Sequence, residues 1–349
     1  MRIKYLAAAL LALTSVGCGS EDDGDEQQNP GTEQCEGQAQ YVAFDPVNHE
    51  PQDKRLGAID EMLALFAAVQ ADPTTAAAKA AEVRAIYEST DHNLRAKVQG
   101  RQDVHLTDDA AMVGPAIDDA IVGAIDDLAA ATTALEANLA KQTFEKSGIY
   151  RFLYLSVMYE LYEPSKKHYD EAFGYYGSGN TDTDASRRGL ARLAAKRDGN
   201  NDTTLASELF ALVLDGKCAL ADALAAAGTD TIEMGTDATY DDIVDQIDAR
   251  LQLVMAYSIG HELIEFEADK ADADTAAIKI WEADGFFDIV EPYLASGTTE
   301  EQQFAADFRA ALDDAMSKVA AGDTSWIATF DGAGFLETVE SIYGIDVKG

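Results

Sequence analysis

Two short stretches of the sequence combine a histidine with carboxylates at helical spacing. The first runs from Glu160 to Tyr176 (E-L-Y-E-P-S-K-K-H-Y-D-E-A-F-G-Y-Y) and places His168 and Glu171 at i and i+3. The second is H-E-L-I-E, in which His261 and Glu265 stand at i and i+4. Both spacings put two side chains on one face of a helix, close enough to share an ion. Imidazole combined with carboxylate suits transition metals such as zinc and iron.

Helical bundles often assemble metal sites from such pairs on facing helices. We therefore predict one shared site for a transition metal or a metal-bearing ligand, with four ligands drawn from the two stretches: His168, Glu171, His261 and Glu265. Two further acids are secondary candidates. Glu160 lies within about 20° of Glu171 if the helix continues across Pro164, and Glu262 adjoins His261.

The pair His261 and Glu265 falls on the inward stripe of a helix expected over 240–269, which Ile247, Leu251 and Val254 mark. An unpaired carboxylate in a dry core costs several kcal/mol, so it requires a cation, a proton or a hydrogen-bonded partner. Three interpretations stay open: a structural pair, a metal site, and general acid–base catalysis without metal.

Catalytic signatures are missing from the sequence. The H-E-x-x-H zinc motif begins at His261 but has Glu265 where the second histidine belongs. There is no G-x-S-x-G elbow, phosphate loop or haem-attachment motif. We therefore name no catalytic residue. A metal-dependent hydrolase is the least favoured alternative, with Glu262 as its water-activating acid.

The composition predicts an all-α fold. Alanine is abundant, only 7 of the 349 residues are proline, and long segments lack β-branched runs. Apolar residues recur at helical spacing, which predicts helices over 55–71, 72–89, 107–141, 144–163, 205–214, 218–227, 240–269, 275–294, 299–321 and 335–343. We expect a helical bundle of two packed lobes, residues 41–230 and 231–349, because the Gly- and Thr-rich segment 228–239 interrupts the helices.

The N-terminus has the pattern of a secretory signal peptide over residues 1–17. Arg2 and Lys4 precede an apolar run that is too short to span a bilayer, and small residues lead to Cys18. This ending resembles a bacterial lipobox, which implies lipidation of Cys18; an ordinary signal peptide with an incidental cysteine is the alternative. Residues 18–40 are expected to be a lipidated, disordered tether. Gly19 after the cysteine favours the outer membrane, by resemblance to lipoprotein sorting.

An oxidising envelope favours a disulfide between the two other cysteines, Cys35 and Cys218. The alternative is two free thiols. Removing residues 1–17 takes away two positive charges and changes the net charge from −37 to −39. Such a surface repels nucleic acid. The expected partners are therefore the membrane, through the lipid, and envelope proteins.

The first stretch also resembles a known family. Residues 167–175 (K-H-Y-D-E-A-F-G-Y) resemble the K-H-[WY]-D-E-A-[FY]-G-Y hallmark of a family of bacterial envelope lipoproteins with a domain of unknown function. Residues 261–265 are similar to the family's H-x-L-S-E segment, with Ile264 in place of Ser, and 334–346 are similar to its C-terminal signature.

That family is similar in outline to imelysin-like proteins, which are all-α, two-lobed, secreted or lipid-anchored, and associated with iron uptake. The resemblance implies the same fold and location, and a role in iron acquisition. The imelysin G-x-H-x-x-E motif, placed on His261, requires Gly and Glu where this chain has Ile259 and Ile264. The imelysin metal site and peptidase activity are therefore not expected to transfer. The alternative function is a non-enzymatic scaffold or partner-binding lipoprotein with structural His/Glu pairs.

Overall fold

The computed structural model describes residues 39–45, 47–106, 111–177, 179 and 186–348. These residues form helices joined by loops, with no β-strand among them, which confirms the all-α prediction. The signal peptide, Cys18, Cys35 and nearly all of the tether lie outside the described residues. Within the described part of the chain, no helix is both long and apolar enough to cross a membrane.

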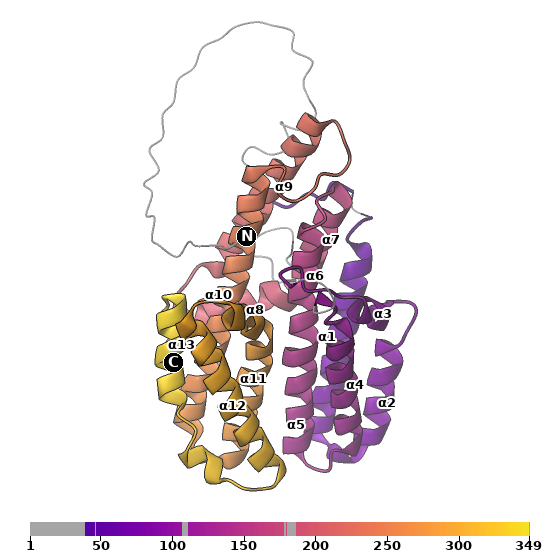
Figure 1. Ribbon diagram of the computed structural model, residues 1–349. Coiled ribbons are helices and arrows are strands. Elements are labelled where there is room, and N and C mark those ends of the chain that lie inside the picture. Colours follow the sequence, from indigo (N-terminus) through magenta and orange to yellow (C-terminus); the bar gives the residue numbers. More distant parts are fainter. Residues whose placement is uncertain (1–38, 46, 107–110, 178, 180–185, 349) are drawn as a thin grey trace, which may run out of the picture.

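The first half of the chain forms one side of the molecule (Figure 1). Its helices are α1 (Glu50–Ala71), the 3-10 helix η2 (Pro73–Thr75), α2 (Ala76–Tyr87), α3 (Leu94–Gln99), α4 (Gly114–Ala130), α5 (Ala134–Gln142), the π-helix η4 (Thr143–Tyr150), α6 (Arg151–Leu161) and α7 (Lys166–Tyr176). Short capping motifs set their boundaries. Helix α1 ends before Asp72, as the sequence predicts, and the Asp72 carboxylate accepts a hydrogen bond from the backbone N–H of Thr74, which caps the start of η2.

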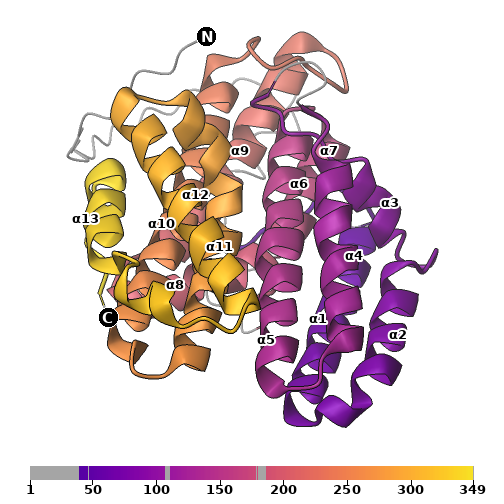
Figure 2. The ribbon, with the colours of Figure 1, turned by 60° about the horizontal axis from the view of Figure 1, so that its bottom comes forward.

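The second half packs beside it (Figure 2). Its helices are α8 (Gly189–Asn201), α9 (Leu205–Ala227), α10 (Ala238–Asp269), α11 (Ala273–Ser296), α12 (Thr299–Ala320), the 3-10 helix η5 (Ser325–Ala328) and α13 (Gly332–Tyr343). The long helix α10 is its centre, because α8, α9, α11 and α13 all pack against it. Aspartates Asp237 and Asp272 cap the starts of α10 and α11.

The apolar core is continuous through both halves. One cluster of buried side chains extends from Tyr41 to Val347, and α11 packs against α5, α6 and η4 as well as against α10 and α12. The predicted division into two lobes at residue 230 therefore stays a prediction.

Two local predictions are corrected. Residues 205–227 form one helix, α9, because Gly216 and Lys217 are buried in its middle instead of ending it. Helix α8 was not expected, because residues 199–202 (G-N-N-D) have the composition of a turn. In the structure α8 continues to Asn201 and ends at Asp202, whose backbone is left-handed with φ 54°.

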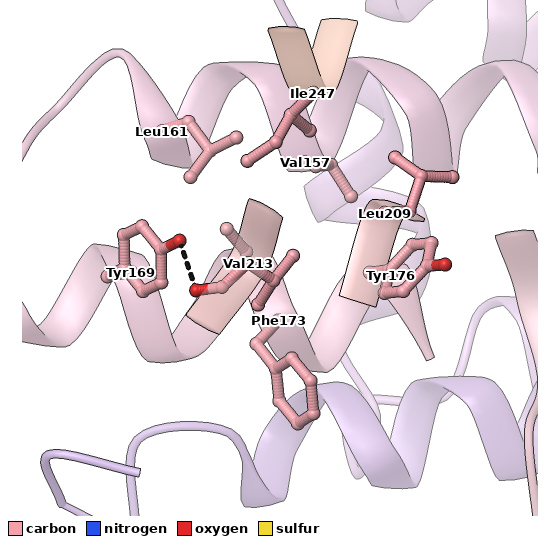
Figure 3. Close-up of a pocket in the computed structure, with 9 residues that line it drawn as sticks. Val157, Leu161, Tyr169, Phe173, Tyr176, Leu209, Val213 and Ile247 are labelled. Atoms are coloured by element: carbon pink, nitrogen blue, oxygen red, sulfur yellow. Dashed lines mark hydrogen bonds between the residues drawn. The ribbon is translucent and has the colours of Figure 1, made fainter. Parts of the chain in front are cut away.

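The K-H-Y-D-E-A-F-G-Y stretch lies in α7, and its aromatic rings are buried packing residues. Figure 3 shows Tyr169 and Tyr176 among aliphatic side chains of α6, α9 and α10. The Tyr169 hydroxyl donates to the backbone carbonyl of Val213 at 2.7 Å. The cavity between these side chains has a volume of about 10 Å³, which is room for one water molecule at most.

Asp170 holds the N-terminal segment against α7. Its carboxylate is fully buried and accepts four hydrogen bonds of 2.8–3.0 Å, from the Tyr41 hydroxyl, the backbone N–H groups of Phe44 and Asp45, and the Asn48 amide. One turn later, a Cβ on Gly174 would lie 2.8 Å from the Cβ of Gln52 in α1, so only glycine permits this approach.

We predict that Asp170→Asn loses about 3 kcal/mol or more of unfolding free energy, because an amide cannot accept hydrogen bonds from all four donors. Urea unfolding followed by circular dichroism measures the change. Asp53→Asn is the matched control, since that carboxylate is 59% exposed. Equal losses in the two variants would show that the Asp170 contacts contribute nothing special.

Candidate functional site

The structure brings the first group of predicted ligands together. His168, Glu171 and Glu160 line one surface pocket of about 420 Å³ between α3, α6 and α7. His168 Nδ1 lies 2.9 Å from the backbone carbonyl and 3.2 Å from the carboxylate of Glu163, so the ring faces back along the chain.

The two predicted ligand acids of this pocket, Glu160 and Glu171, already have cationic partners. The Glu160 carboxylate accepts from the Arg101 guanidinium at 3.1 Å, and both side chains are only 4% exposed. Lys167 lies 3.5 Å from Glu171. Burial raises the pKa of Glu160 above its ordinary value, while Arg101 opposes that shift. An ion here would have to compete with an internal arginine.

The second group forms a tighter cluster on α10. One ligand atom from each of His261, Glu262 and Glu265 lies within 4.8 Å of the others. His261 Nε2 is 3.2 Å from Glu265, as expected from their i, i+4 spacing. Glu262 is the more buried acid at 2% exposure, whereas Glu265 is 37% exposed. Ser258, Glu262 and Phe266 are buried, so at this end of α10 the inward face is centred on Glu262 and not on His261 and Glu265.

The two groups do not share a site, which corrects the predicted four-ligand arrangement. The ring of Tyr169, next to His168, lies 6.2 Å from the ring of Tyr240 at the start of α10. His261 follows Tyr240 by 21 residues on the same continuous helix, which corresponds to about 31 Å along its axis. The sequence could not show this, because it does not specify which end of α10 faces α7.

A buried arginine and a partly exposed lysine complete the α10 cluster. Arg197 of α8 is 1% exposed and donates to Ser258 Oγ at 2.9 Å and to Glu262 at 3.0 Å. Lys279 of α11 reaches Glu262 at 3.3 Å and also contacts Glu265. Its third partner is Glu282 of α11, at 3.0 Å. The lysine ammonium thus occupies the position between carboxylates that a metal ion would take.

The carboxylates of this network differ in their affinity for protons. Arg197 and Lys279 pair with Glu262, Glu265 and Glu282, and Lys146 also lies close to Glu282. Burial and the neighbouring Glu282 raise the pKa of Glu262 to about 7. Glu282, hydrogen-bonded to Glu262 and close to Lys146 and Lys279, has a pKa of about 2 despite its burial. Glu262 is therefore the acid of this network that takes up a proton most readily as the pH falls below neutrality.

His261 remains neutral in this setting. Burial and the positive charge of Arg197 lower its pKa to about 4. The Asn200 amide nitrogen lies 3.1 Å from Nε2 and 3.2 Å from Nδ1. An unprotonated imidazole that is 12% exposed is chemically able to bind a metal ion. Glu262, held by Arg197 and Lys279, is not placed to activate water, so the hydrolase alternative loses its named residue.

The comparisons with known proteins find no match. No protein-family model, curated protein or solved structure matches this chain. The resemblance to envelope lipoproteins and imelysin-like proteins therefore stays a prediction. Cys218, one half of the predicted Cys35–Cys218 disulfide, lies on α9 and is disulfide-bonded. Cys35 lies outside the described residues, so the pairing itself stays a prediction.

Sequence reasoning missed Arg197, Lys279 and Glu282. Lys279 and Glu282 stand at i and i+3 on a helix that the sequence does predict, so their shared face was detectable. Arg197 gave no such signal, because α8 itself was not predicted. Asp248 of α10 is also largely buried, at 13% exposure, and accepts a hydrogen bond from Tyr154.

We predict that Arg197→Met destabilises the protein by about 3–5 kcal/mol, because it leaves Glu262 buried without its main partner. The double variant Arg197→Met plus Glu262→Gln should recover most of that loss, as measured by chemical unfolding. Arg250→Met is the control, since the Arg250–Glu208 pair is about 40% exposed on both sides and exposed pairs contribute about 0–1 kcal/mol. A double variant no more stable than Arg197→Met would refute the pairing.

A second prediction concerns pH. Folding raises the pKa of Glu262, so the folded state binds more protons than the unfolded state between about pH 4.5 and pH 7. The stabilisation from this proton is present below that range and is lost as the pH rises through it. Compared with Glu262→Gln, the wild-type protein should therefore become progressively less stable from pH 4.5 to pH 7. Urea unfolding at several pH values tests this; a constant difference would contradict the raised pKa.

Proposed function

We propose that this protein is a lipid-anchored envelope protein that binds one transition-metal ion on α10, with His261, Glu265 and Glu262 as ligands. The observation that carries the proposal is the convergence of their ligand atoms within 4.8 Å. One nitrogen and two carboxylate oxygens form a donor set that suits zinc or ferrous iron.

The exposure of the ligands to solvent also supports this metal site. Glu265 is 37% exposed and His261 12% exposed, so an ion can meet these two ligands from solvent before reaching the deeper Glu262. Carboxylates attract cations, and the net charge of −37 raises the local concentration of cations around the whole protein.

In this proposal Lys279 acts as an internal counterion that the metal displaces. Its ammonium contacts Glu262, Glu265 and Glu282, while the side chain itself is 18% exposed and lies near solvent. A divalent ion entering the cluster replaces that single positive charge, and the lysine side chain turns outward. The metal therefore competes with Lys279 for the same oxygens.

The envelope location rests on the N-terminal sequence, with Cys18 as the lipidated residue and the outer membrane as the destination. Iron acquisition is the role that the resemblance to imelysin-like proteins suggests. The His168, Glu171 and Glu160 pocket is left out of the metal site, because Arg101 and Lys167 neutralise its acids.

The second candidate function is a scaffold or partner-binding lipoprotein in which the His261 cluster is purely structural. Arg197 and Lys279 favour it, because they satisfy Glu262 without any metal. On this alternative, substitutions in the cluster lower the melting temperature, and added metal does not change it.

A titration of Zn²⁺, Fe²⁺ and Mn²⁺ into the purified protein by calorimetry separates the two functions. We expect His261→Ala to weaken binding at least tenfold and Lys279→Ala to strengthen it about tenfold, because the competing ammonium is gone. His168→Ala is the matched control and should leave affinity unchanged. If Lys279→Ala binds no metal at all, the metal proposal fails and the structural alternative stands.

A further inference from the structure

The surface pocket that contains His168 and Glu171 is large enough for an organic ligand. Its volume of about 420 Å³ lies within the range of small-molecule sites in proteins. One wall is α3 with the residues that flank it, and the other is formed by α6, α7 and the turn between them. Most of the side chains on each wall are polar or charged, so the pocket suits a polar ligand.

The two walls carry opposite charges. On the α3 wall the charged residues are Lys97 and Arg101, and no acid lines that wall. The α6–α7 wall has one lysine, Lys167, and three acids, Glu160, Glu163 and Glu171. Arg101 and Glu160 neutralise each other through their ion pair. What remains is one positive charge on the α3 wall, and two acids and one lysine on the other wall, which sum to −1.

Lys97 is the cation that this arrangement leaves without a partner. Its side chain is half-buried, and its ammonium makes no ion pair or hydrogen bond with any residue in the described ranges. The chain has 63 acidic residues against 26 lysines and arginines, yet none of the described acids lies within pairing distance of this ammonium. Lys97 is therefore available to a ligand carboxylate.

The opposite wall offers hydrogen-bond acceptors that solvent can reach. His168 Nδ1 lies 2.9 Å from the backbone carbonyl oxygen of Glu163, which can only accept, so Nδ1 carries the hydrogen and Nε2 of the neutral ring is an acceptor. The side chains of Glu163 and His168 are 45% and 27% exposed. Glu171 is less open, at 12% exposure. Two carboxylates and one imidazole nitrogen together suit a ligand ammonium group.

Tyr159 holds this acidic wall in place. A hydrogen bond with the Glu163 carboxylate raises the pKa of Tyr159 to about 12, so the hydroxyl stays protonated and donates to Glu163. On its other side, the Arg101 guanidinium lies 5.0 Å from the centre of the Tyr159 ring. Because these contacts exist before any ligand arrives, less conformational freedom is lost on binding.

We propose that this pocket binds a small zwitterion of the α-amino acid type. The ligand carboxylate pairs with Lys97, and the ligand ammonium donates to Glu163, Glu171 and His168 Nε2. A purely anionic ligand would meet the acidic wall and the net charge of −37, and a purely cationic one would meet Lys97. The pocket is separate from the α10 metal cluster, so this inference does not depend on the proposed metal function.

The test begins with a thermal-shift screen of the common L-amino acids against the purified protein. The amino acid that raises the melting temperature most is then compared by calorimetry with two derivatives of itself. Its amide keeps only the positive charge, and its N-acetyl form keeps only the negative charge. We expect the amino acid to bind at least tenfold more tightly than either derivative.

Two variants assign each charge of the ligand to one wall. Lys97→Met should weaken binding of the amino acid at least tenfold and abolish its advantage over the amide, while the melting temperature of the free protein is kept because Lys97 has no partner to lose. Glu171→Gln should reduce the advantage over the N-acetyl form. Lys79→Met, which removes a lysine of α2 outside the pocket, is the matched control and should leave affinity unchanged.

An amide or N-acetyl derivative that binds the wild-type protein as tightly as the amino acid would overturn the choice of a zwitterion. No binding of any amino acid at millimolar concentration, or binding that Lys97→Met leaves intact, would overturn the site itself. Lys97→Met keeps the test decisive if Glu171→Gln does not fold.

Discussion

The ion pair between Arg197 and Glu262 is the constraint on which the second half of this protein depends. Both side chains are almost fully buried, and neither is tolerable alone in an apolar core. Satisfying them requires α8, α10 and α11 to approach closely, with Ser258 accepting from the arginine and Lys279 contacting the far side of the carboxylate. The same approach brings Lys146 of η4 against α11, where a Cβ on Gly285 would lie 2.2 Å from the lysine Cβ, so only a residue without a side chain fits.

Burial of charge also explains the conspicuous stretch on α7. Three of its residues contact different neighbours: Asp170 holds the N-terminal segment, Tyr169 donates to α9, and Tyr175 accepts from Arg55 and Arg101. Gly174 admits α1. A dense group of polar and aromatic residues thus resembles a ligand site in the sequence, although most of it forms contacts between helices. The distinction depends on tertiary neighbours that no local spacing reveals.

Periodicity and capping chemistry were enough to predict the helices whose ends carry clear signals. Helix α1 ends before Asp72, and α10 was expected over nearly its whole length. Helix α8 was not predicted, because its C-terminal residues favour turns. Arg197, which lies in this helix, was therefore not recognised as part of the cluster. For the site, the i, i+4 pair of His261 and Glu265 was predicted correctly as a local contact. His168, predicted to share a site with this pair, lies far from it. Which end of α10 faces α7 is determined by the packing of the helices, and the residue pattern within each helix does not reveal it.

The four hydrogen bonds to Asp170 have a mechanical consequence. Tyr41, Phe44 and Asp45 are all held by this one carboxylate, so tension applied at Tyr41 is delivered to the middle of α7. The Tyr41 ring, stacked on Phe173 with centres 3.6 Å apart, shares the load. Because the four bonds converge on one group, the attachment of residues 41–48 to α7 acts as a single unit.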